Sequence, residues 1–427
     1  MLDSADLGVV ERERGVTVLR TLLDAEALAA LLSERRGTAH EVTPGRLRYK
    51  PGTSCVLAFD LRTITDEGPA VMPCIAKAYA PSTTAKWEKS LQEVPRGHLL
   101  LEDPGLRLVI TTLAGDRHLR AVSRLFDDAA RLPLLERLLP GHTDLAAGTV
   151  TTLRHNPERR WVGTLDTPAG DRLVLRAYPR SSALEHIHAY ARLHGTGADI
   201  PAFLGKTRRH GMLAVSWADG DVLGHSADPA DLRVVGRALA GFHLRRPPEL
   251  GVSTPLAHAD RVRRAAAQVA LLQPDAAEPA RQIADHLISR LREAPVGGNL
   301  VHGDFSRDQV VLGPGGEPTL IDLDSAAVGE AATDLGSFWA ALLVEARSPA
   351  EEAGITGRVE TLMSGYDTLR RPPDRALVLL YRDSHLLGRA AEGFRTRRPR
   401  WAEHMSRVLS TLESGAARTA FADGGSR

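Results

Sequence analysis

Short runs in which apolar and polar residues alternate fill the first half of the chain. RLRYKP at residues 46–51 is followed by SCVLAFDL, and TLRHNP at residues 152–157 is followed by RWVGTLDT. In each segment a turn leads to a second such run, PCIAKAYAPS at 73–82 and RLVLRAYPRS at 172–181. Alternation bounded by turns rich in Pro and Gly is typical of antiparallel hairpins. We therefore expect two small antiparallel sheets.

The two segments form an internal repeat. Each continues into a helix-like stretch, TTAKWEKSLQEV or ALEHIHAYARLH, and ends in an extended stretch with a turn, LVITTLAGDRHL or LAVSWADGDVLG. Lys77 and Arg176 occupy the same place in the two copies. Because these features recur in one order, we interpret the segments as a duplication, with one module over residues 1–139 and the other over 140–222.

The periodicity changes after residue 228, where apolar residues recur at helical spacing. We expect a helical region over 223–415, interrupted only around 300–323 by two short apolar runs joined by GPGG. This interruption predicts a hairpin inside a helical domain. Residues 416–427, which end in FADGGSR, predict a disordered tail.

The composition excludes several classes of function. The chain has 427 residues, 43% of them hydrophobic and 25% charged, and its formal net charge is +1. These values are typical of a globular protein with two or three domains and leave no global basic field for nucleic acid or an anionic membrane. Two cysteines, Cys55 and Cys74, are too few for a disulfide framework. The N-terminus lacks a signal-peptide pattern and no apolar stretch is long enough to span a bilayer, so we expect a cytoplasmic protein with no nucleic-acid or membrane partner.

The predicted hairpin carries the residues with the clearest chemistry. It begins HGDFSRDQ and ends IDLD, which places Asp304, Gln309 and Asp322 in order along it. Phosphoryl transfer needs a carboxylate beside the acceptor hydroxyl and oxygen ligands for the Mg²⁺ on the nucleotide phosphates. A kinase catalytic loop supplies these as an Asp, an amide five residues later, and a second Asp after a short hairpin. The ordered set therefore predicts a phosphotransferase site.

With these motifs the sequence resembles the aminoglycoside phosphotransferase and choline kinase-like superfamily of small-molecule kinases. The resemblance covers residues 147–345, and the motifs HGDFSRDQVVL and LIDLDSAAVGEAATDLGSF carry most of it. It implies an α+β, protein-kinase-like bilobal fold, with a small antiparallel-sheet lobe over 140–222 and a large helical catalytic lobe over 223–415. The duplicated small-lobe-like module over 1–139 is then an addition, interpreted as a cap or as a dimer surface.

The resemblance implies a role for each residue of the hairpin. Asp304 would be the catalytic base or the group that orients the acceptor hydroxyl, and His302 would brace its loop. Asp322 would be the principal Mg²⁺ ligand. Gln309 stands where the family usually has Asn, although maltokinase-like members have Gln, and it would be a second ligand. Asp334 would hold the hairpin to the next helix.

The nucleotide-binding residues are expected in the second module. Arg176 stands where a phosphate-contacting Lys is usual, and Glu185 on the following helix is either its partner or part of a solvated helix face. The backbone around Ser216 and Trp217 would meet the adenine of ATP if this stretch is the hinge, and would be a buried strand otherwise.

Several residues keep two interpretations. No Gly-rich phosphate loop is present; the equivalent turn reads HNPERR, so that Arg159 or Arg160 either contacts phosphate or lies at an exposed hairpin tip. In one alternative the first module supplies the nucleotide contacts through Lys77. Asp324 is a further candidate metal ligand, and Asp308 is interpreted as a loop-capping or acceptor-side residue.

Arginines crowd the C-terminal segment, at Arg382, Arg389, Arg395, Arg397, Arg398 and Arg400. We interpret them as a solvated helix face. If they line the acceptor cleft instead, they argue against a polycationic aminoglycoside and suit a neutral or anionic acceptor.

The sequence thus predicts an ATP- and Mg²⁺-dependent phosphotransferase that acts on a hydroxyl group of a small molecule, such as an aminoglycoside-like antibiotic, a sugar or another natural product. A maltokinase-like sugar kinase would keep the chemistry and change only the acceptor. The alternative from another class is a catalytically silent kinase-like binding module. The expected partner is the small-molecule substrate, with homodimer formation as an additional option; neither the acceptor nor the choice of ATP over GTP can be read from the sequence.

Overall fold

The chain divides into two compact units in the computed structural model, which describes residues 2–65, 68–142, 144–197, 199–224, 227–346 and 348–424. Unit 1 comprises Met1–Ile187, Leu204–Ser216 and Gly393–Trp401. Unit 2 comprises His188–Phe203, Trp217–Glu392 and Ala402–Arg427. Within the described ranges, no helix has both the length and the apolar character needed to cross a membrane.

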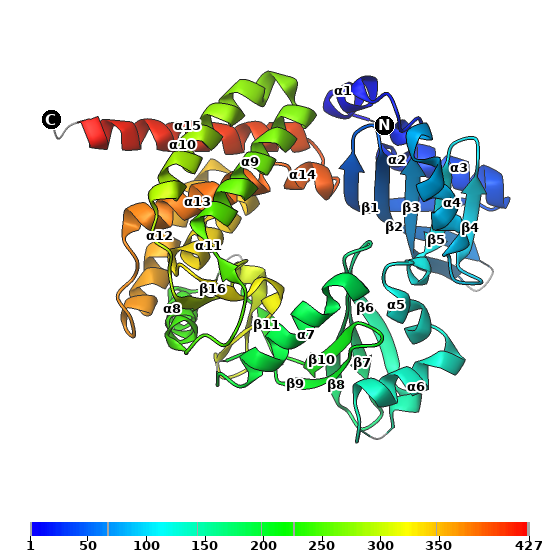
Figure 1. Cartoon of the computed structure of the whole chain (residues 1–427), viewed down its shortest axis with the longest axis horizontal. Helices are drawn as coiled ribbons and strands as arrows, with labels where there is room; N and C mark the ends of the chain where they lie inside the picture. The colour runs from blue at the N-terminus through cyan, green and yellow to red at the C-terminus, as the bar shows by residue number, and fades with distance from the viewer. Residues whose placement is uncertain are drawn as a thin grey trace. The chain divides into compact units, whose positions relative to one another are not determined.

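Unit 1 contains two antiparallel sheets with one strand order. The first is ordered β1-β2-β3-β5-β4 and the second β6-β7-β8-β10-β9 (Figure 1). The strands of the first are β1 (His40–Lys50), β2 (Ser54–Thr65), β3 (Gly68–Tyr79), β4 (Leu99–Asp103) and β5 (Leu108–Thr112). The strands of the second are β6 (Thr149–Asn156), β7 (Arg160–Asp166), β8 (Arg172–Ala177), β9 (Phe203–Thr207) and β10 (Met212–Ser216). In each sheet a helix follows the third strand in chain order: α4 (Thr84–Gln92) lies between β3 and β4, and α7 (Arg180–His194) lies between β8 and β9.

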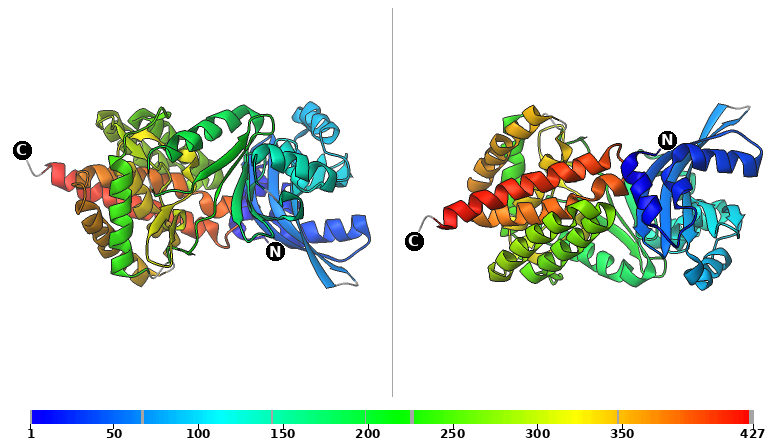
Figure 2. Two further views of the ribbon diagram at one scale, coloured as in Figure 1. Left: turned by 90° about the horizontal axis from the view of Figure 1, so that it is seen from below. Right: turned by 90° about the horizontal axis from the view of Figure 1, so that it is seen from above.

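The register of the two sheets also agrees. Lys77 lies opposite Val56 and Val109 in the first sheet, and Arg176 lies opposite Val162 and Leu213 in the second. The equivalence of Lys77 and Arg176 in the repeat therefore holds at the level of strand pairing. The sheets differ in length, since β2 and β3 have 12 residues each where β7 has seven and β8 has six, and the long β2–β3 hairpin extends beyond β4 and β5 (Figure 2).

Short helices complete unit 1. Three precede the first sheet: α1 (Ser4–Arg12), α2 (Leu19–Leu23) and α3 (Ala25–Arg36). Two lie between the sheets, α5 (Arg120–Leu125) and α6 (Asp128–Leu138). The apolar side chains of α5 and α6 form one buried core with Trp161, Leu175 and Met212 of the second sheet. Residues 120–138 therefore cover a face of the sheet that they precede in the chain.

Unit 2 is built from helices around two small three-stranded sheets. The helices are α8 (Pro229–Leu244), α9 (Pro255–Leu272), α10 (Ala277–Glu293), α11 (Ala332–Glu345), α12 (Pro349–Asp367) and α13 (Arg375–Arg389). The sheets are ordered β11-β14-β15 and β12-β16-β13, with strands β11 (Asp221–Val222), β12 (Val252–Ser253), β13 (Asn299–Val301), β14 (Val310–Leu312), β15 (Pro318–Leu320) and β16 (Ala327–Gly329).

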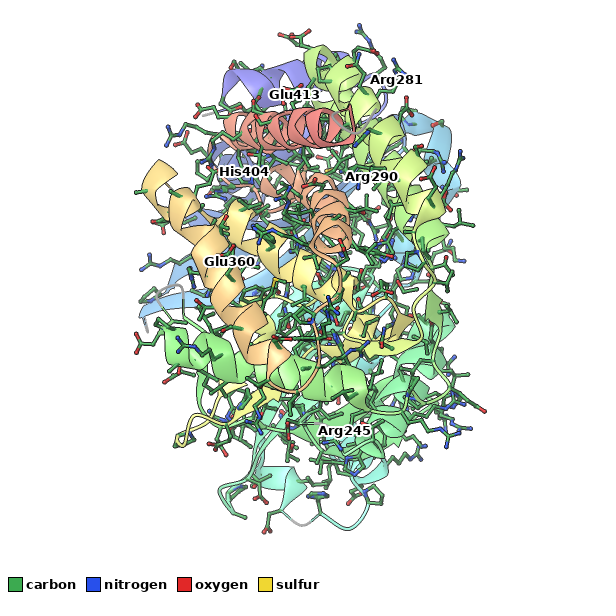
Figure 3. The ribbon with its side chains drawn as sticks, turned by 90° about the vertical axis from the view of Figure 1, so that its left-hand side faces the viewer. Arg245, Arg281, Arg290, Glu360, His404 and Glu413 are labelled. Carbon is green, nitrogen blue, oxygen red and sulfur yellow. The ribbon has the colours of Figure 1, made fainter. Side chains whose placement is uncertain are left out.

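The helices of unit 2 pack in pairs, α8 with α12, α9 with α10, and α11 with α13. Because α11 is buried along nearly its whole length, it forms the centre of the helical core. Helix α10 lies at the surface, where Arg281 pairs with Glu278 and Asp285 at 2.6 and 2.9 Å along its exposed side (Figure 3).

The C-terminal segment returns to unit 1 through residues 393–401, which include most of α14 (Glu392–Arg395) and the first residue of α15 (Trp401–Gly424). Arg397 donates to both carboxylate oxygens of Asp6 on α1, at 3.0 and 2.6 Å, and the indole Nε1 of Trp401 donates to Asp6 at 3.0 Å. Helix α15 continues to Gly424, within the stretch 416–427 predicted as a disordered tail; residues 425–427 lie outside the described residues.

The predicted fold class is confirmed: antiparallel sheets precede a helical region that a short hairpin interrupts. The duplication and the four sequence domains stay predictions. One of the boundaries between the compact units falls between Ser216 and Trp217, at the stretch predicted to be the hinge.

Candidate active site

The loop that carries Asp304 follows the short strand β13, and Gly303 makes its first turn possible. Gly303 has a φ of +82°, in the left-handed region that favours glycine. A Cβ atom there would lie 2.2 Å from the carbonyl oxygen of Ser325. Any other residue would therefore push the loop away from the segment after β15.

Asp334, in the first turn of α11, anchors this loop. Its carboxylate is fully buried and accepts the backbone N–H of His302 at 2.7 Å and of Gly303 at 2.8 Å. His243 of α8 donates from Nε2 to the same carboxylate at 2.9 Å, and its Nδ1 lies 2.8 Å from the hydroxyl of Tyr366. Since a carboxylate only accepts, Nε2 carries the proton. The loop is thus fixed to two helices through one buried charge.

Hydrogen bonding outweighs burial at Asp334. Burial alone would raise the pKa of its carboxyl, but the bond from His243 and the backbone N–H of His302 lower the pKa below its ordinary value. Asp334 is therefore ionised at neutral pH and holds the loop as an anion, in agreement with the structural role expected for it.

The hairpin β14–β15 returns the chain to this loop. The backbone N–H of Ile321 donates to the carbonyl of Gln309 at 2.9 Å, and His302 Nε2 donates to the carbonyl of Ile321 at 2.8 Å. His302 therefore braces the loop against the residue that precedes Asp322. On the far side, the backbone N–H of Leu323 donates to the hydroxyl of Tyr190 on α7 at 3.1 Å. Asp322 itself adopts a left-handed conformation with a φ of 59°.

The donor set here fits a hard divalent cation that is shared with phosphates. Gln309 is buried, and its Nε2 donates to Asp308 at 3.1 Å, which leaves the amide oxygen as the group available for a cation. Asp322 adds a carboxylate from the neighbouring position of the hairpin. Among the described residues no cluster of three His, Cys, Asp or Glu side chains could hold a metal ion alone. Mg²⁺ in kinase sites needs only one or two carboxylates because substrate phosphates and water complete its shell.

Asp304 is the exposed carboxylate of the loop, with 59% of its side chain accessible. Arg389 of α13 donates from Nη2 to its Oδ1 at 2.9 Å. The surrounding protein raises the pKa of Asp304, and the charge of Asp322 adds to that rise, whereas Arg389 opposes it.

A family model described as the phosphotransferase enzyme family matches residues 154–371, slightly more than half of the chain. The chain belongs to the phosphotransferase enzyme family. The match includes β7 to β10 and the end of β6 in the second sheet, the Asp304 loop and the β14–β15 hairpin, and it leaves the first sheet outside. The protein is accordingly a small-molecule phosphotransferase, as the sequence predicted.

Solved structures resemble this phosphotransferase in fold. An amicoumacin kinase, hAmiN, solved in complex with AMP-PNP, Ca²⁺ and Ami, matches with a TM-score of 0.50 and 16% identity, over 69% of this chain and 96% of its own. A choline kinase, LicA from Streptococcus pneumoniae, matches with a TM-score of 0.49 and 14% identity, over 62% of this chain and 93% of its own. At such identity the likeness to the amicoumacin kinase shows the fold alone. No curated protein sequence matches the chain.

The residues predicted to bind nucleotide in this phosphotransferase lie in both units. Arg176 is buried on β8 and donates from Nε to the hydroxyl of Tyr178 at 2.8 Å. Glu185 lies on the exposed side of α7, and in the described structure no ion pair joins it to Arg176. Ser216 ends β10 in unit 1, and Trp217 begins the next segment of unit 2. The nucleotide-binding roles of these residues stay predictions.

Lys77 has a partner that the sequence did not reveal. Glu158, at the tip of the β6–β7 hairpin, lies 3.1 Å from Lys77 Nζ and also pairs with Arg48. The fully buried Asp116 accepts the backbone N–H of Glu158 at 2.7 Å and lies 3.2 Å from His155 Nε2. The turn that replaces a Gly-rich loop is therefore clamped onto the first module within unit 1. This pairing does not favour the alternative in which Lys77 contacts nucleotide.

The interpretation of the C-terminal arginines as a solvated face is wrong for three of them. Arg389 reaches Asp304, and only 26% of its side chain is exposed. Arg382 is largely buried, lies over the ring of Trp339 with its Cζ 5.0 Å from the centroid, and pairs with Asp383. Arg397 is buried against Asp6. Helical periodicity alone did not reveal these contacts, because Asp304, Asp6 and Trp339 lie on other elements and Asp383 follows Arg382 directly in the chain.

Proposed function

We propose that this phosphotransferase transfers the γ-phosphoryl group of ATP, with Mg²⁺, to a hydroxyl group of a small molecule. The observation that carries the proposal is the Asp304 loop. An exposed carboxylate stands on a loop that Asp334 and His302 hold rigidly, beside a hairpin that presents Gln309 and Asp322. This arrangement supports phosphoryl transfer, in which positioning and charge neutralisation supply most of the rate.

In the proposed reaction the acceptor hydroxyl oxygen attacks the γ-phosphorus of ATP while the bond to the ADP oxygen breaks. Asp304 orients the hydroxyl and accepts its proton, so that the products are a phosphate ester, ADP and a proton. His302 acts through the loop, as the brace that fixes the position of Asp304.

Gln309 and Asp322 would hold the cation. When bound, Mg²⁺ would neutralise charge on the nucleotide phosphates. Arg176 would contact phosphate with its planar guanidinium, and Glu185 and the backbone at Ser216 and Trp217 are the further nucleotide-side candidates. The nucleotide and divalent cation in the amicoumacin kinase structure support this part of the proposal.

The test measures two properties of the full-length chain: thermal stabilisation by ATP with and without Mg²⁺, and ADP release with a library of amino sugars, disaccharides, nucleosides and choline-like alcohols. We expect stabilisation only with Mg²⁺ and turnover with some acceptors. Asp304→Asn should lower turnover by roughly 10²- to 10⁴-fold, the usual contribution of a positioned base, while nucleotide stabilisation persists. Asp322→Asn should abolish the Mg²⁺-dependent stabilisation.

Asp260→Asn is the matched control, since Asp260 is an exposed acid of α9 that pairs only with its neighbour Arg263. It should leave both readouts unchanged. Wild-type turnover in Asp304→Asn would overturn the proposed role of this carboxylate. Mg²⁺-dependent nucleotide binding with no turnover of any acceptor would favour the silent binding module. We expect the enzyme to be free in the cytoplasm and to act on diffusible substrates, without nucleic-acid or membrane partners.

A further inference from the structure

Arg389 stands where the acceptor hydroxyl has to meet Asp304. Its Nη2 donates to Asp304 Oδ1 at 2.9 Å and to Ser337 Oγ of α11 at 3.2 Å. Ser337 is fully buried within unit 2, so its hydroxyl holds the guanidinium in place from the core side. A guanidinium has five N–H donors in a planar fork, and these two bonds use one nitrogen. Arg389 can therefore bind another acceptor without leaving its position.

A second cation faces the same carboxylate from α9. Arg261 lies close enough to Asp304 for the two charges to interact, and its Nη2 donates to Ser253 Oγ at 3.3 Å. Burial and the neighbouring charge of Arg264 both lower the pKa of Arg261, yet a guanidinium keeps its proton throughout the physiological range. Arg389 and Arg261, on two helices of unit 2, thus both act on Asp304, Arg389 through a hydrogen bond and Arg261 through its charge.

The histidines between these helices add no charge. The rings of His258 and His385 lie 3.2 and 3.4 Å from Thr333 Oγ1; His258 is buried and His385 is half-buried. Burial and the charge of Arg261 lower the pKa of His258 to about 3, and burial also lowers the pKa of His385. Both rings are neutral at pH 7. The positive charge at this face therefore comes from the arginines.

The acidic residues of the two helices are already paired. Helix α9 has one acid, Asp260, which pairs with Arg263, and α13 has one acid, Asp383, which pairs with Arg382 at 2.7 Å. The two helices together carry six arginines and only these two carboxylates. Three of the six arginines pair with other acids, Arg263 with Asp260, Arg382 with Asp383 and Arg375 with Glu360. Arg389 and Arg261 act on Asp304 itself, and an anionic group of the acceptor would be the counter-charge for these two.

We infer that the acceptor carries an anionic group, a phosphate or a carboxylate, close to the hydroxyl that is phosphorylated, and that Arg389 and Arg261 bind this group. The inference rests on the proposed function. Without an acceptor, Arg389 is bonded to Asp304. When the anion of the acceptor takes over this bond, Asp304 Oδ1 becomes the acceptor for the hydroxyl proton. The pair therefore selects the substrate and couples its binding to release of the base.

The experiment compares matched probes that differ in one anionic group: glycerol 3-phosphate with glycerol, glucose 6-phosphate with glucose, and glycerate with glycerol. Binding to the full-length chain is measured by calorimetry with saturating Mg²⁺ and AMP-PNP, so that the nucleotide phosphates occupy their own site. ADP release with ATP is measured on the same pairs. We expect the anionic member of at least one pair to bind more tightly, by roughly 10- to 150-fold, the range for a hydrogen bond to a charged group.

Arg389→Gln should remove this preference and leave the affinity for Mg²⁺ and AMP-PNP unchanged. The control is Arg375→Gln, at the opposite end of α13, where Arg375 pairs with the exposed Glu360 of α12 at 3.1 Å (Figure 3). This control should keep the preference. If Asp304→Asn is made in parallel, it should lose turnover and still bind the anionic probes.

Three outcomes overturn the inference: tighter binding of the uncharged members, a preference that survives in Arg389→Gln, or no binding of any anionic probe. If one of these outcomes is found and the enzyme still phosphorylates uncharged or cationic alcohols, the proposed kinase function stands and only the inference about the anionic acceptor fails. Absence of Mg²⁺-dependent nucleotide binding would instead remove the proposed function itself. The two failures are therefore distinguishable.

Discussion

Replacing Asp334 with Asn tests whether one buried charge holds the catalytic loop. Asp334→Asn has nearly the same shape and keeps one oxygen, but it replaces the other oxygen with an N–H donor. That donor would face the backbone N–H of His302 or of Gly303. In the wild type these N–H nitrogens lie 2.7 and 2.8 Å from the carboxylate oxygens of Asp334. Rotating the amide does not help, because His243 Nε2 also donates into the carboxylate. At least one buried donor would lose its acceptor.

The magnitude follows from the bonds that are lost. A hydrogen bond to a charged group contributes about 1.5–3 kcal/mol, and removing one partner of a buried charged pair costs about 3–5 kcal/mol. Asp334 accepts three such bonds, of which the amide oxygen can replace one or two. We expect Asp334→Asn to lower the free energy of opening this loop by about 3–5 kcal/mol, which is roughly a 150- to 5000-fold increase in the open fraction.

The pH dependence follows from the lowered pKa of Asp334. A carboxyl whose pKa is lower in the folded state stabilises that state fully above its unfolded pKa of about 3.9, and the contribution is lost as the pH falls through the folded value. His243, His302 and Tyr366 are the titratable groups around it. The difference between wild type and Asp334→Asn should therefore be constant from pH 6 to 8, and it should shrink at pH values below about 4.

Hydrogen–deuterium exchange measured on peptides that cover residues 300–306 reports on this loop directly. Asp334→Asn should accelerate exchange there while peptides from the first sheet stay protected, and turnover should fall with it. Asp260→Asn, an exposed acid, is the control. Unchanged exchange at His302 and Gly303 in Asp334→Asn would refute the reasoning, because the loop would then be held by contacts other than this carboxylate.

Three further predictions concern unit 1. Lys77→Met should destabilise the unit by about 2–5 kcal/mol in thermal or urea unfolding, and adding Glu158→Gln should recover part of the loss, because the second change removes an acid that has lost one of its two cations and keeps only Arg48; equal losses in the single and double variants would exclude coupling. The thiols of Cys55 and Cys74 should not react with a thiol reagent until the protein unfolds, because both are buried and the pKa of each is raised to about 12. Rapid labelling of the native chain would contradict their burial. Asp6→Asn should lower the melting temperature because it weakens the bonds from Arg397 and Trp401, and a melt unchanged from wild type would show that residues 393–401 are held otherwise.

The sequence predicted the elements of the fold because its local signals agree with the structure. Alternation in RWVGTLDT and RLVLRAYPRS corresponds to β7 and β8, and the GPGG turn joins β14 to β15. Motif spacing also brought Gln309 and Asp322 onto one hairpin, since a short turn forces its two arms to pair. These features depend on residues that are near one another in the chain, where periodicity and turn chemistry act directly.

The contacts that the sequence did not reveal join residues far apart in the chain. Glu158 meets Lys77, Arg389 meets Asp304, and Asp6 meets Arg397. The periodicity of the sequence does not reveal such pairs, because an arginine on a helix has the same local sequence pattern whether its partner is water or a carboxylate from another element. The excess of arginine in the chain made the signal weaker still, because arginines at the surface and in ion pairs are indistinguishable in one sequence.

The two sheets show how positions that share a register can have different neighbours. Lys77 and Arg176 share a register, so their backbones present the side chains in the same way. What differs is the neighbour: Glu158 reaches Lys77 from the hairpin of the second sheet, and its side chain is only 12% exposed. A nucleotide phosphate at Lys77 would have to displace Glu158, which would then lose one of its two cations in a largely buried place close to Asp116. The hairpin of the second sheet therefore pairs with the cation of the first sheet, and we expect a change at Arg176, not at Lys77, to alter nucleotide affinity.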